Sequence, residues 1–337
     1  MGRILLFNPS HEMALAANAA HYTPPKQIQQ MEADLCRLPL LWAEDGDCVL
    51  TSNEPVNPSL VPTPWGWNKS VRNRFLRQGA NPALMPSEQQ LDAWRNYSSR
   101  AWAADYCQQL YHRWQDGGLV HNHVGFIHST ADYEAWLSQY GYAPYIVKSE
   151  YSSSGRGNRV CNDKQSIKNY QLSTINYQRF VIDTFYEKLL DFAMEFEITK
   201  QEVHCLGLSV FKTTSEGRYT FNYLRSQQQL NEMIVGYLPD ASVIDRLKEL
   251  HRQLLSFRLL GHYEGIVGID MMVVQGGLIH PCVEINLRMN MGVVAMKLFE
   301  KGLTSIPRFP YGGQHFYPVI EDGKFFIAYS STPSSEQ

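Results

Sequence analysis

Two carboxylates and an amide near the end of the chain have the residue types and the spacing of a metal site. Glu284 and Asn286 are two residues apart on an expected strand, Leu278–Leu287, so their oxygens leave the same face. Asp270 belongs to the preceding expected strand, Ile266–Val274, where apolar neighbours make an unpartnered carboxylate costly. Hard oxygen ligands of this kind are typical of Mg²⁺ sites that substrate phosphates complete. They favour a metal site over an edge hairpin whose polar residues face water.

The register of this hairpin decides whether the three residues can share a metal. With a two-residue turn at Gly276-Gly277, Asp270 would face Val283, which puts Asp270 and Glu284 on opposite sides of the sheet. A shared metal requires an odd-length loop or a bulge, which glycines readily permit. A regular two-residue turn without a bulge would therefore exclude the metal site.

A lysine at the end of another expected strand leads into a loop rich in serine and glycine. The strand Tyr145–Val147 delivers Lys148 to Ser152-Ser-Ser-Gly-Arg-Gly157. Glycines let backbone N–H groups approach phosphate oxygens closely, and a lysine supplies a point charge. A flexible surface hairpin with an incidental lysine is the alternative. The segment is neither a dinucleotide-binding glycine fingerprint nor a P-loop, so these two common nucleotide folds are not indicated.

A third polar group follows the first expected strand, Arg3–Phe7. The segment Asn8-Pro-Ser-His11-Glu12 lies at its end, where α/β sheets open their ligand crevices, and His11 and Glu12 could orient a substrate amine or carboxylate. The alternative is a helix cap by Ser10 and a partly buried histidine.

The elements that must position these residues are visible in the hydrophobic pattern. A helix is expected over Met13–Ala20, and a surface loop over Thr51–Trp67, which carries four prolines. Helical spacing continues over Ser98–Trp114 and from Ile244 to Phe257, where Gly261 provides a left-handed cap. Antiparallel strands are expected at Tyr145–Val147, Tyr177–Asp183, Phe192–Thr199 and Leu206–Lys212.

Composition limits the classes of protein that need considering. The 337 residues are enough for about two domains, and a hydrophobic fraction of 44% excludes disorder. A net charge of -3 without a basic cluster argues against nucleic-acid partners, and no apolar stretch approaches a membrane span. The six cysteines are scattered and the N-terminus lacks a signal-peptide core, so we expect a cytoplasmic protein.

The combination of motifs resembles the ATP-grasp superfamily over roughly residues 98–296. The motifs are Ile146-Val-Lys148 with Ser152–Gly157, Gly268-Ile-Asp270, and Glu284-Ile-Asn286-Leu-Arg288. The resemblance implies an ATP-grasp fold of the α/β and α+β class, with ATP and Mg²⁺ between two α+β subdomains. The implied segments are an N-terminal α/β domain (1–97), a lid subdomain (98–186), a C-terminal subdomain (187–330) and a frayed tail (331–337).

The resemblance also implies a role for each matching residue. Lys148 would reach adenine and phosphate, and the lid over the triphosphate would be Ser153, Ser154, Gly155, Arg156 and Gly157. The hinge whose backbone meets adenine would be Asp183, Thr184, Phe185 and Tyr186. Asp191 would bind ribose, with Glu187 as a rival, and Asp270, Glu284 and Asn286 would bind Mg²⁺. Arg288 would face the transferring phosphate or the acyl group. Arg100 stands where the family often has a lysine, and Lys212 is a further candidate for a phosphate contact.

The function that the resemblance implies is an ATP- and Mg²⁺-dependent ligase. It would activate a carboxylate as an acylphosphate and join it to an amine, with Lys148 and Arg288 as catalytic residues. Its partners would be small-molecule carboxylates and amines, not nucleic acid or membrane. Oligomer formation is possible. A kinase on the same fold and a non-catalytic ATP-binding regulator are the alternatives.

Overall fold

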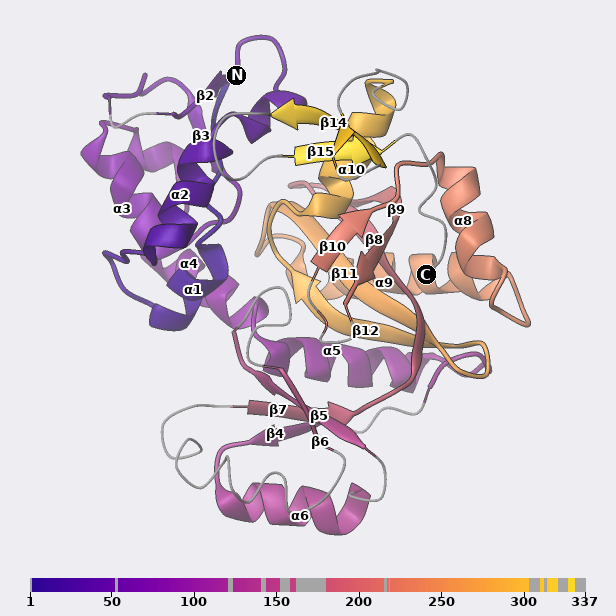
Figure 1. Ribbon diagram of the computed structural model, residues 1–337. Coiled ribbons are helices and arrows are strands. Elements are labelled where there is room, and N and C mark those ends of the chain that lie inside the picture. Colours follow the sequence, from indigo (N-terminus) through magenta and orange to yellow (C-terminus); the bar gives the residue numbers. More distant parts are fainter. Residues whose placement is uncertain are drawn as a thin grey trace. The chain divides into compact units, whose positions relative to one another are not determined.

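The computed structural model describes most of the chain, arranged in two compact units (Figure 1). The first unit comprises Met1–Ala93, Leu224–Ser226 and Arg288–Gln337, and the second comprises Trp94–Tyr223 and Gln227–Leu287. The described residues are 2–51, 54–120, 124–140, 144–151, 158–161, 180–214, 217, 219–302, 310–311, 314–320 and 327–330.

A parallel sheet forms the centre of the first unit. Its strand order is β2-β1-β3, with β1 at Arg3–Leu6, β2 at Cys48–Val49 and β3 at Val61–Pro64. The buried first strand is thus confirmed, and the expected helix after it is α1, which spans His11–Ala17 and ends at Asn18 in the left-handed conformation. The remaining elements of this part are α2 (Lys26–Asp34), η1 (Leu38–Leu41), α3 (Lys69–Arg77), η2 (Pro82–Leu84) and α4 (Glu88–Tyr97), which crosses into the second unit.

The expectation of a loop throughout Thr51–Trp67 is wrong, because Val61–Pro64 forms strand β3. Val61 N–H donates to the Gly2 carbonyl over 3.0 Å, and Trp65 N–H donates to the Leu6 carbonyl over 2.6 Å. The prolines occupy the alternate positions of an edge strand, where no N–H is needed for the ladder. Edge placement therefore accommodates prolines that would disrupt a central strand.

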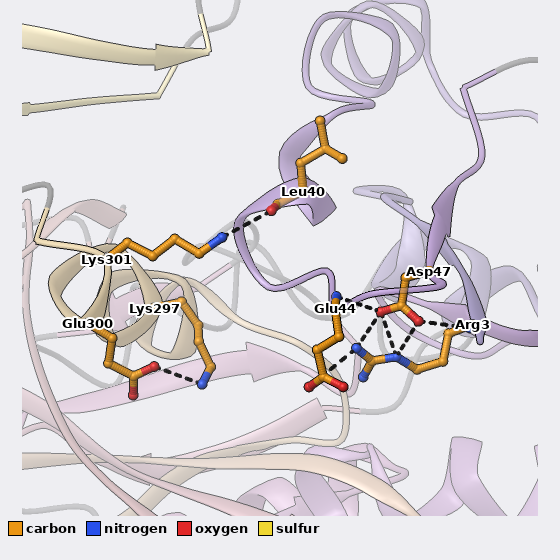
Figure 2. Close-up of polar contacts among 7 residues, drawn as sticks. All are labelled: Arg3, Leu40, Glu44, Asp47, Lys297, Glu300 and Lys301. Carbon is orange, nitrogen blue, oxygen red and sulfur yellow. Dashed lines mark hydrogen bonds and ion pairs between the residues drawn. The ribbon is translucent and has the colours of Figure 1, made fainter. Parts of the chain in front are cut away.

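Polar contacts connect segments of this unit that are distant in the sequence (Figure 2). Arg3 on β1 pairs with Asp47 just before β2, with Nη2 2.5 Å from Oδ2, and lies 3.7 Å from Glu44. Helix α10 (Met291–Glu300) is followed by Lys301, whose ammonium donates to the Leu40 carbonyl at the end of η1 over 3.3 Å. The last described strands, β13 (Pro310–Tyr311), β14 (Gln314–Ile320) and β15 (Ile327–Ser330), form an antiparallel sheet.

In the second unit, the end of α4 is followed by helix α5 (Arg100–Arg113). The unit also contains a small antiparallel sheet of order β4-β7-β5-β6. Its strands are β4 (Gly125–Ile127), β5 (Tyr145–Ser149), β6 (Arg159–Cys161) and β7 (Phe180–Thr184), and α6 (Thr130–Tyr140) covers it. Trp136 of α6 packs into its core, and a Cβ on Gly125 would lie 2.3 Å from the Trp136 ring. This sheet carries Lys148, and the predicted strands at Tyr145 and before Asp183 are confirmed over their described residues.

A five-stranded antiparallel sheet of order β10-β9-β8-β11-β12 forms the rest of the second unit (Figure 1). Its strands are β8 (Lys188–Ile198), β9 (Val203–Thr213), β10 (Tyr219–Asn222), β11 (Gly265–Val274) and β12 (Leu278–Asn286). Helices α8 (Gln227–Val235) and α9 (Val243–Leu259) pack against it, and Gly261 follows α9 with φ +80°, as expected for a left-handed cap. The predicted strands and the amphipathic helix of this region are confirmed.

The two faces of this sheet differ in polarity because side chains alternate along each strand. On β8, one set of side chains is apolar and faces α9, whose His251 ring lies 6.4 Å from the Phe196 ring. The alternate set faces the other side, where Ala193 pairs with Asp270 of β11. The buried apolar residues on the α9 side of β8 are Phe192, Met194, Phe196 and Ile198. This apolar face determines which side of the sheet remains for the polar residues.

Replacing Phe196 by alanine tests whether this apolar face anchors the sheet. Phe196 is fully buried, so we expect Phe196→Ala to lower the free energy of unfolding by about 3–5 kcal/mol. The adjacent Glu197 is exposed on the opposite face, and Glu197→Ala should change stability by less than about 0.5 kcal/mol. Urea denaturation followed by circular dichroism measures both, and equal losses would contradict the assignment of faces.

Candidate functional site

The β11–β12 hairpin places Asp270 and Glu284 directly opposite each other. Val274 pairs with Leu278, which leaves a three-residue loop, and the register then shifts between Asp270 and Met272 so that Asp270 pairs with Glu284. Pro281 lies in the irregular part of β12, where it cannot donate to the ladder. The odd-length loop and the irregularity both occur, so the two carboxylates share a face and the condition for a common metal is met.

Asn286 completes this polar group. Its Nδ2 donates to Asp270 Oδ2 over 3.1 Å, and its strand neighbour on β11 is Gly268, which has no side chain to fill the space. Within the described part of the chain, no three His, Cys, Asp or Glu residues cluster as a metal site. Mg²⁺ held by two carboxylates and an amide oxygen would have room for further ligands such as phosphate oxygens.

Arg100 reaches this group from the start of α5. Ser99 caps the helix, its side chain accepting from Trp102 N–H over 3.1 Å, so Arg100 occupies the first helical position. The guanidinium is 5% exposed; Nη1 donates to the Ser149 carbonyl over 2.7 Å and Nη2 to Glu284 Oε2 over 3.1 Å. The structure thus brings Arg100, the end of β5 and the candidate metal ligands together.

Lys148 lies in a buried charge network that sequence reasoning did not anticipate. Its ammonium lies 3.1 Å from Asp183 Oδ2, and His280 Nε2 lies 3.6 Å from the same oxygen. Burial raises the pKa of Asp183, but Lys148 and His280 outweigh it, so the net pKa is below the ordinary value. Asp183 was expected to act through its backbone; here its side chain holds Lys148. No spacing signal links two residues 35 positions apart, whereas His280 shares a strand with Glu284 and could have been noticed.

The expected hinge after Asp183 is tied down at its backbone. Phe185 N–H donates to the Pro144 carbonyl over 2.9 Å, and the Glu187 carbonyl accepts from Gln275 N–H over 3.0 Å. Thr184 closes β7 opposite Tyr145. Tyr186 packs its ring against His280 with 5.8 Å between centroids, and burial raises the pKa of its hydroxyl to about 12.

The remaining nucleotide-binding candidates fall in three places. Asp191, on β8, accepts from Lys188 Nζ over 2.5 Å and from Thr213 Oγ1 over 2.7 Å. Lys212 is exposed and, by strand alternation, lies on the opposite face of the sheet from Asp191, whose partner on β9 is Phe211. The expected lid residues Ser153, Ser154, Gly155, Arg156 and Gly157 lie outside the described residues.

The first unit gathers the three candidate substrate residues. Arg288 Nε pairs with Glu12 Oε1, and His11 Nδ1 lies 3.4 Å from Asn68 Nδ2. Ser10 makes no side-chain capping bond, so the capping alternative is not realised. Burial lowers the pKa of His11 to about 4, with Glu12 opposing this and Arg288 adding to it. Burial raises the pKa of Glu12, but Arg288 and His11 outweigh it and the net shift is downward.

The loop after β3 shapes the space around this cluster. The Asn8 side chain donates to the Gly66 carbonyl over 2.9 Å and accepts from Gly66 N–H over 3.2 Å. A Cβ at Gly66 would lie 2.5 Å from the His11 ring, so only glycine permits this close approach. Trp65 accepts from Met289 N–H over 2.8 Å, which fixes the residue next to Arg288.

The lysine-bearing small sheet and the larger sheet with its paired carboxylates define the ATP-grasp fold, and this chain has that fold. N5-carboxyaminoimidazole synthetase from Staphylococcus aureus, complexed with ADP, matches with a TM-score of 0.51 and 11% identity over 88% of this chain and 77% of that one. Biotin carboxylase from Campylobacter jejuni, in a β-γ-ATP complex, matches with a TM-score of 0.52 and 15% identity over 88% of this chain and 68% of that one.

A curated relative is the [butirosin acyl-carrier protein]–L-glutamate ligase of Niallia circulans. It is 24% identical over 160 residues, which are 47% of this chain and 35% of that protein. The chain thus spans about a third of the length of this relative. No known protein-family model matches the chain. No helix in the described residues is long and apolar enough to cross a membrane.

The buried His11 predicts a measurable loss of stability in acid. Its folded pKa, about 4, lies below the ordinary 6.5, so between these values the unfolded chain takes up a proton that the folded chain does not. The free energy of unfolding should therefore fall as pH drops from 6.5 towards 4, with about 3 kcal/mol due to His11.

Denaturation at a series of pH values in His11→Gln should show this contribution removed. The matched control is His204→Gln on β9, where the imidazole is 47% exposed. An unchanged pH slope in His11→Gln would show that His11 is not buried as a neutral imidazole.

Proposed function

We propose that this chain is an ATP- and Mg²⁺-dependent ligase that activates a carboxylate as an acylphosphate and joins it to an amine. The observation that carries the proposal is the cross-strand pair of Asp270 and Glu284, flanked by Asn286 and Arg100 on the polar face of the sheet. Two aligned carboxylates repel each other, and a divalent cation bound between them would neutralise both. The ADP and ATP complexes among the structural neighbours support the nucleotide.

Asp270, Glu284 and Asn286 fit Mg²⁺ by the chemistry of their donors. All three offer hard oxygen atoms on one face, and the ion's shell would leave room for phosphate oxygens. Mg²⁺ held there would neutralise charge on the phosphates during transfer.

The cationic side chains of the second unit would bind and orient the nucleotide phosphates. Asp183 holds the Lys148 ammonium in one place, so the charge is positioned before any phosphate arrives. The second oxygen of Asp183, Oδ1, is buried with no hydrogen-bond partner among the described residues, and an amino group of a nucleotide base is a fitting donor for it. Asp191, held by Lys188 and Thr213, remains our candidate for ribose.

We assign recognition of the acyl group to the first unit. Arg288 offers a permanent positive charge, and Glu12 holds it in a fixed orientation. His11 stays neutral above pH 4 and therefore acts as a hydrogen-bonding group rather than a cation. The curated relative is named for L-glutamate as the group that it joins to an acyl-carrier protein, so amino acids are the first carboxylates to test.

Calorimetry with ATP, with and without Mg²⁺, tests the metal and nucleotide assignment. We expect the wild type to bind ATP much more tightly with Mg²⁺, and Asp270→Asn with Glu284→Gln to weaken that binding by about a hundredfold or more. The matched control is Asp245→Asn with Glu249→Gln, the same two changes at exposed positions of α9. Absence of ATP binding in the wild type would refute the proposed function.

A second assay separates the ligase from the kinase and the regulator. A ligase should release ADP with a carboxylate substrate and, in the presence of hydroxylamine, yield a hydroxamate from the trapped acylphosphate. A stable phosphoester would instead identify a kinase, and ATP binding without ADP release under any substrate would identify a regulator.

A further inference from the structure

Arg100 occupies an oxygen that the proposed metal site would use. Its Nη2 donates to Glu284 Oε2 over 3.1 Å, while Nη1 is anchored on the Ser149 carbonyl over 2.7 Å. Its backbone N–H donates to the Glu150 carbonyl over 3.2 Å, so the start of α5 is fixed against the end of β5. The guanidinium is therefore a positioned, buried charge in contact with a metal ligand.

Both carboxylates of the site are thus engaged by donors of the protein itself. Asp270 accepts from the Asn286 amide over 3.1 Å, and Glu284 accepts from Arg100. The amide is neutral and can turn its oxygen towards a cation, but a guanidinium cannot lose its charge. A divalent cation at Glu284 and a guanidinium on the same carboxylate repel each other, so each weakens the binding of the other.

We propose that Arg100 is a charge latch on Glu284 that makes cation binding depend on the nucleotide. Without nucleotide, the guanidinium neutralises Glu284 and weakens the site for a free divalent cation. When nucleotide phosphates arrive, Arg100 transfers its Nη2 contact to a phosphate oxygen and frees Glu284. This inference rests on the proposed function, and it adds a coupling between the two ligands that passes through one side chain.

The latch differs from a plain structural ion pair in the signs of its effects. Removing a purely structural ion pair would weaken the binding of both the cation and the nucleotide, or of neither. Removing a latch should strengthen cation binding in the absence of nucleotide, because the competitor for Glu284 is gone, and weaken nucleotide binding in the absence of metal, because a phosphate contact is lost.

The test compares the wild type with Arg100→Gln in two binding measurements. Mn²⁺ alone is titrated by electron paramagnetic resonance, and ATP in EDTA is titrated by calorimetry. We expect Arg100→Gln to bind Mn²⁺ about tenfold more tightly than the wild type and to bind metal-free ATP about tenfold more weakly. Unchanged or weaker Mn²⁺ binding by folded Arg100→Gln would overturn the latch.

Three further variants make the result specific. In Arg100→Gln with Glu284→Gln, the gain in Mn²⁺ affinity should vanish, because the latch acts through Glu284. Arg258→Gln removes a different ion pair, between Arg258 of α9 and Asp105 of α5, and should leave the affinities for Mn²⁺ and for metal-free ATP unchanged. If Arg100→Gln does not fold, Arg100→Lys keeps the charge but not the two-pronged geometry. Mn²⁺ binding should then tighten less than metal-free ATP binding weakens, and Mn²⁺ binding that does not tighten at all would overturn the latch.

Failure of the latch is distinguishable from failure of the proposed function. If the wild type binds ATP with Mg²⁺ but Arg100→Gln does not bind Mn²⁺ more tightly, the latch is refuted and the proposed function stands. If the wild type binds no ATP, both the latch and the proposed function are refuted.

Discussion

The pairing of Asp270 with Glu284 is the constraint on which the rest of the second unit depends. Two carboxylates facing each other across a strand pair repel, and the adjoining apolar ladder does little to screen them. This repulsion is reduced by the Arg100 guanidinium of α5, which donates to Glu284, and by the Asn286 amide of β12, which donates to Asp270. A slip of one residue in the hairpin would send Glu284 to the side of α9, so the three-residue loop and the irregularity at Pro281 set the chemistry as well as the shape.

Charge neutralisation explains why the small sheet and the large sheet of the second unit meet where they do. Lys148 and Asp183 are both nearly excluded from water, and each is tolerable there only because the other is present. His280 adds a further contact from β12, the strand that carries Glu284 and Asn286. Arg100 makes the corresponding link from α5. Polar contacts at one end of both sheets therefore fix the relation between the lysine and the carboxylates.

The first unit applies the same physical rule to a different set of residues. Arg288, His11 and Glu12 are charged or polar groups in a mostly buried setting. Burial lowers the pKa of His11, and burial raises the pKa of Glu12 but is outweighed by Arg288 and His11, so that the net pKa of Glu12 is lowered. The chain returns to this unit at Arg288, two residues after Asn286 at the end of β12.

The sequence by itself determined the strands β8, β9, β11 and β12 of the large sheet, though not β10, because alternation is a local property. Alternation and helical spacing likewise determined the common face of Glu284 and Asn286 and the helix before Gly261. The sequence could not determine the hairpin register, because one more or one fewer loop residue moves the side chains of a strand to the other face of the sheet. Nor could it determine the edge position that lets Val61–Pro64 form a strand despite its prolines. Nor could it pair Lys148 with Asp183, Arg100 with Glu284, or Arg288 with Glu12, since these partners are distant in sequence. Only the tertiary structure decided those contacts, because a buried charge is stabilised by whichever opposite charge the packing brings within reach.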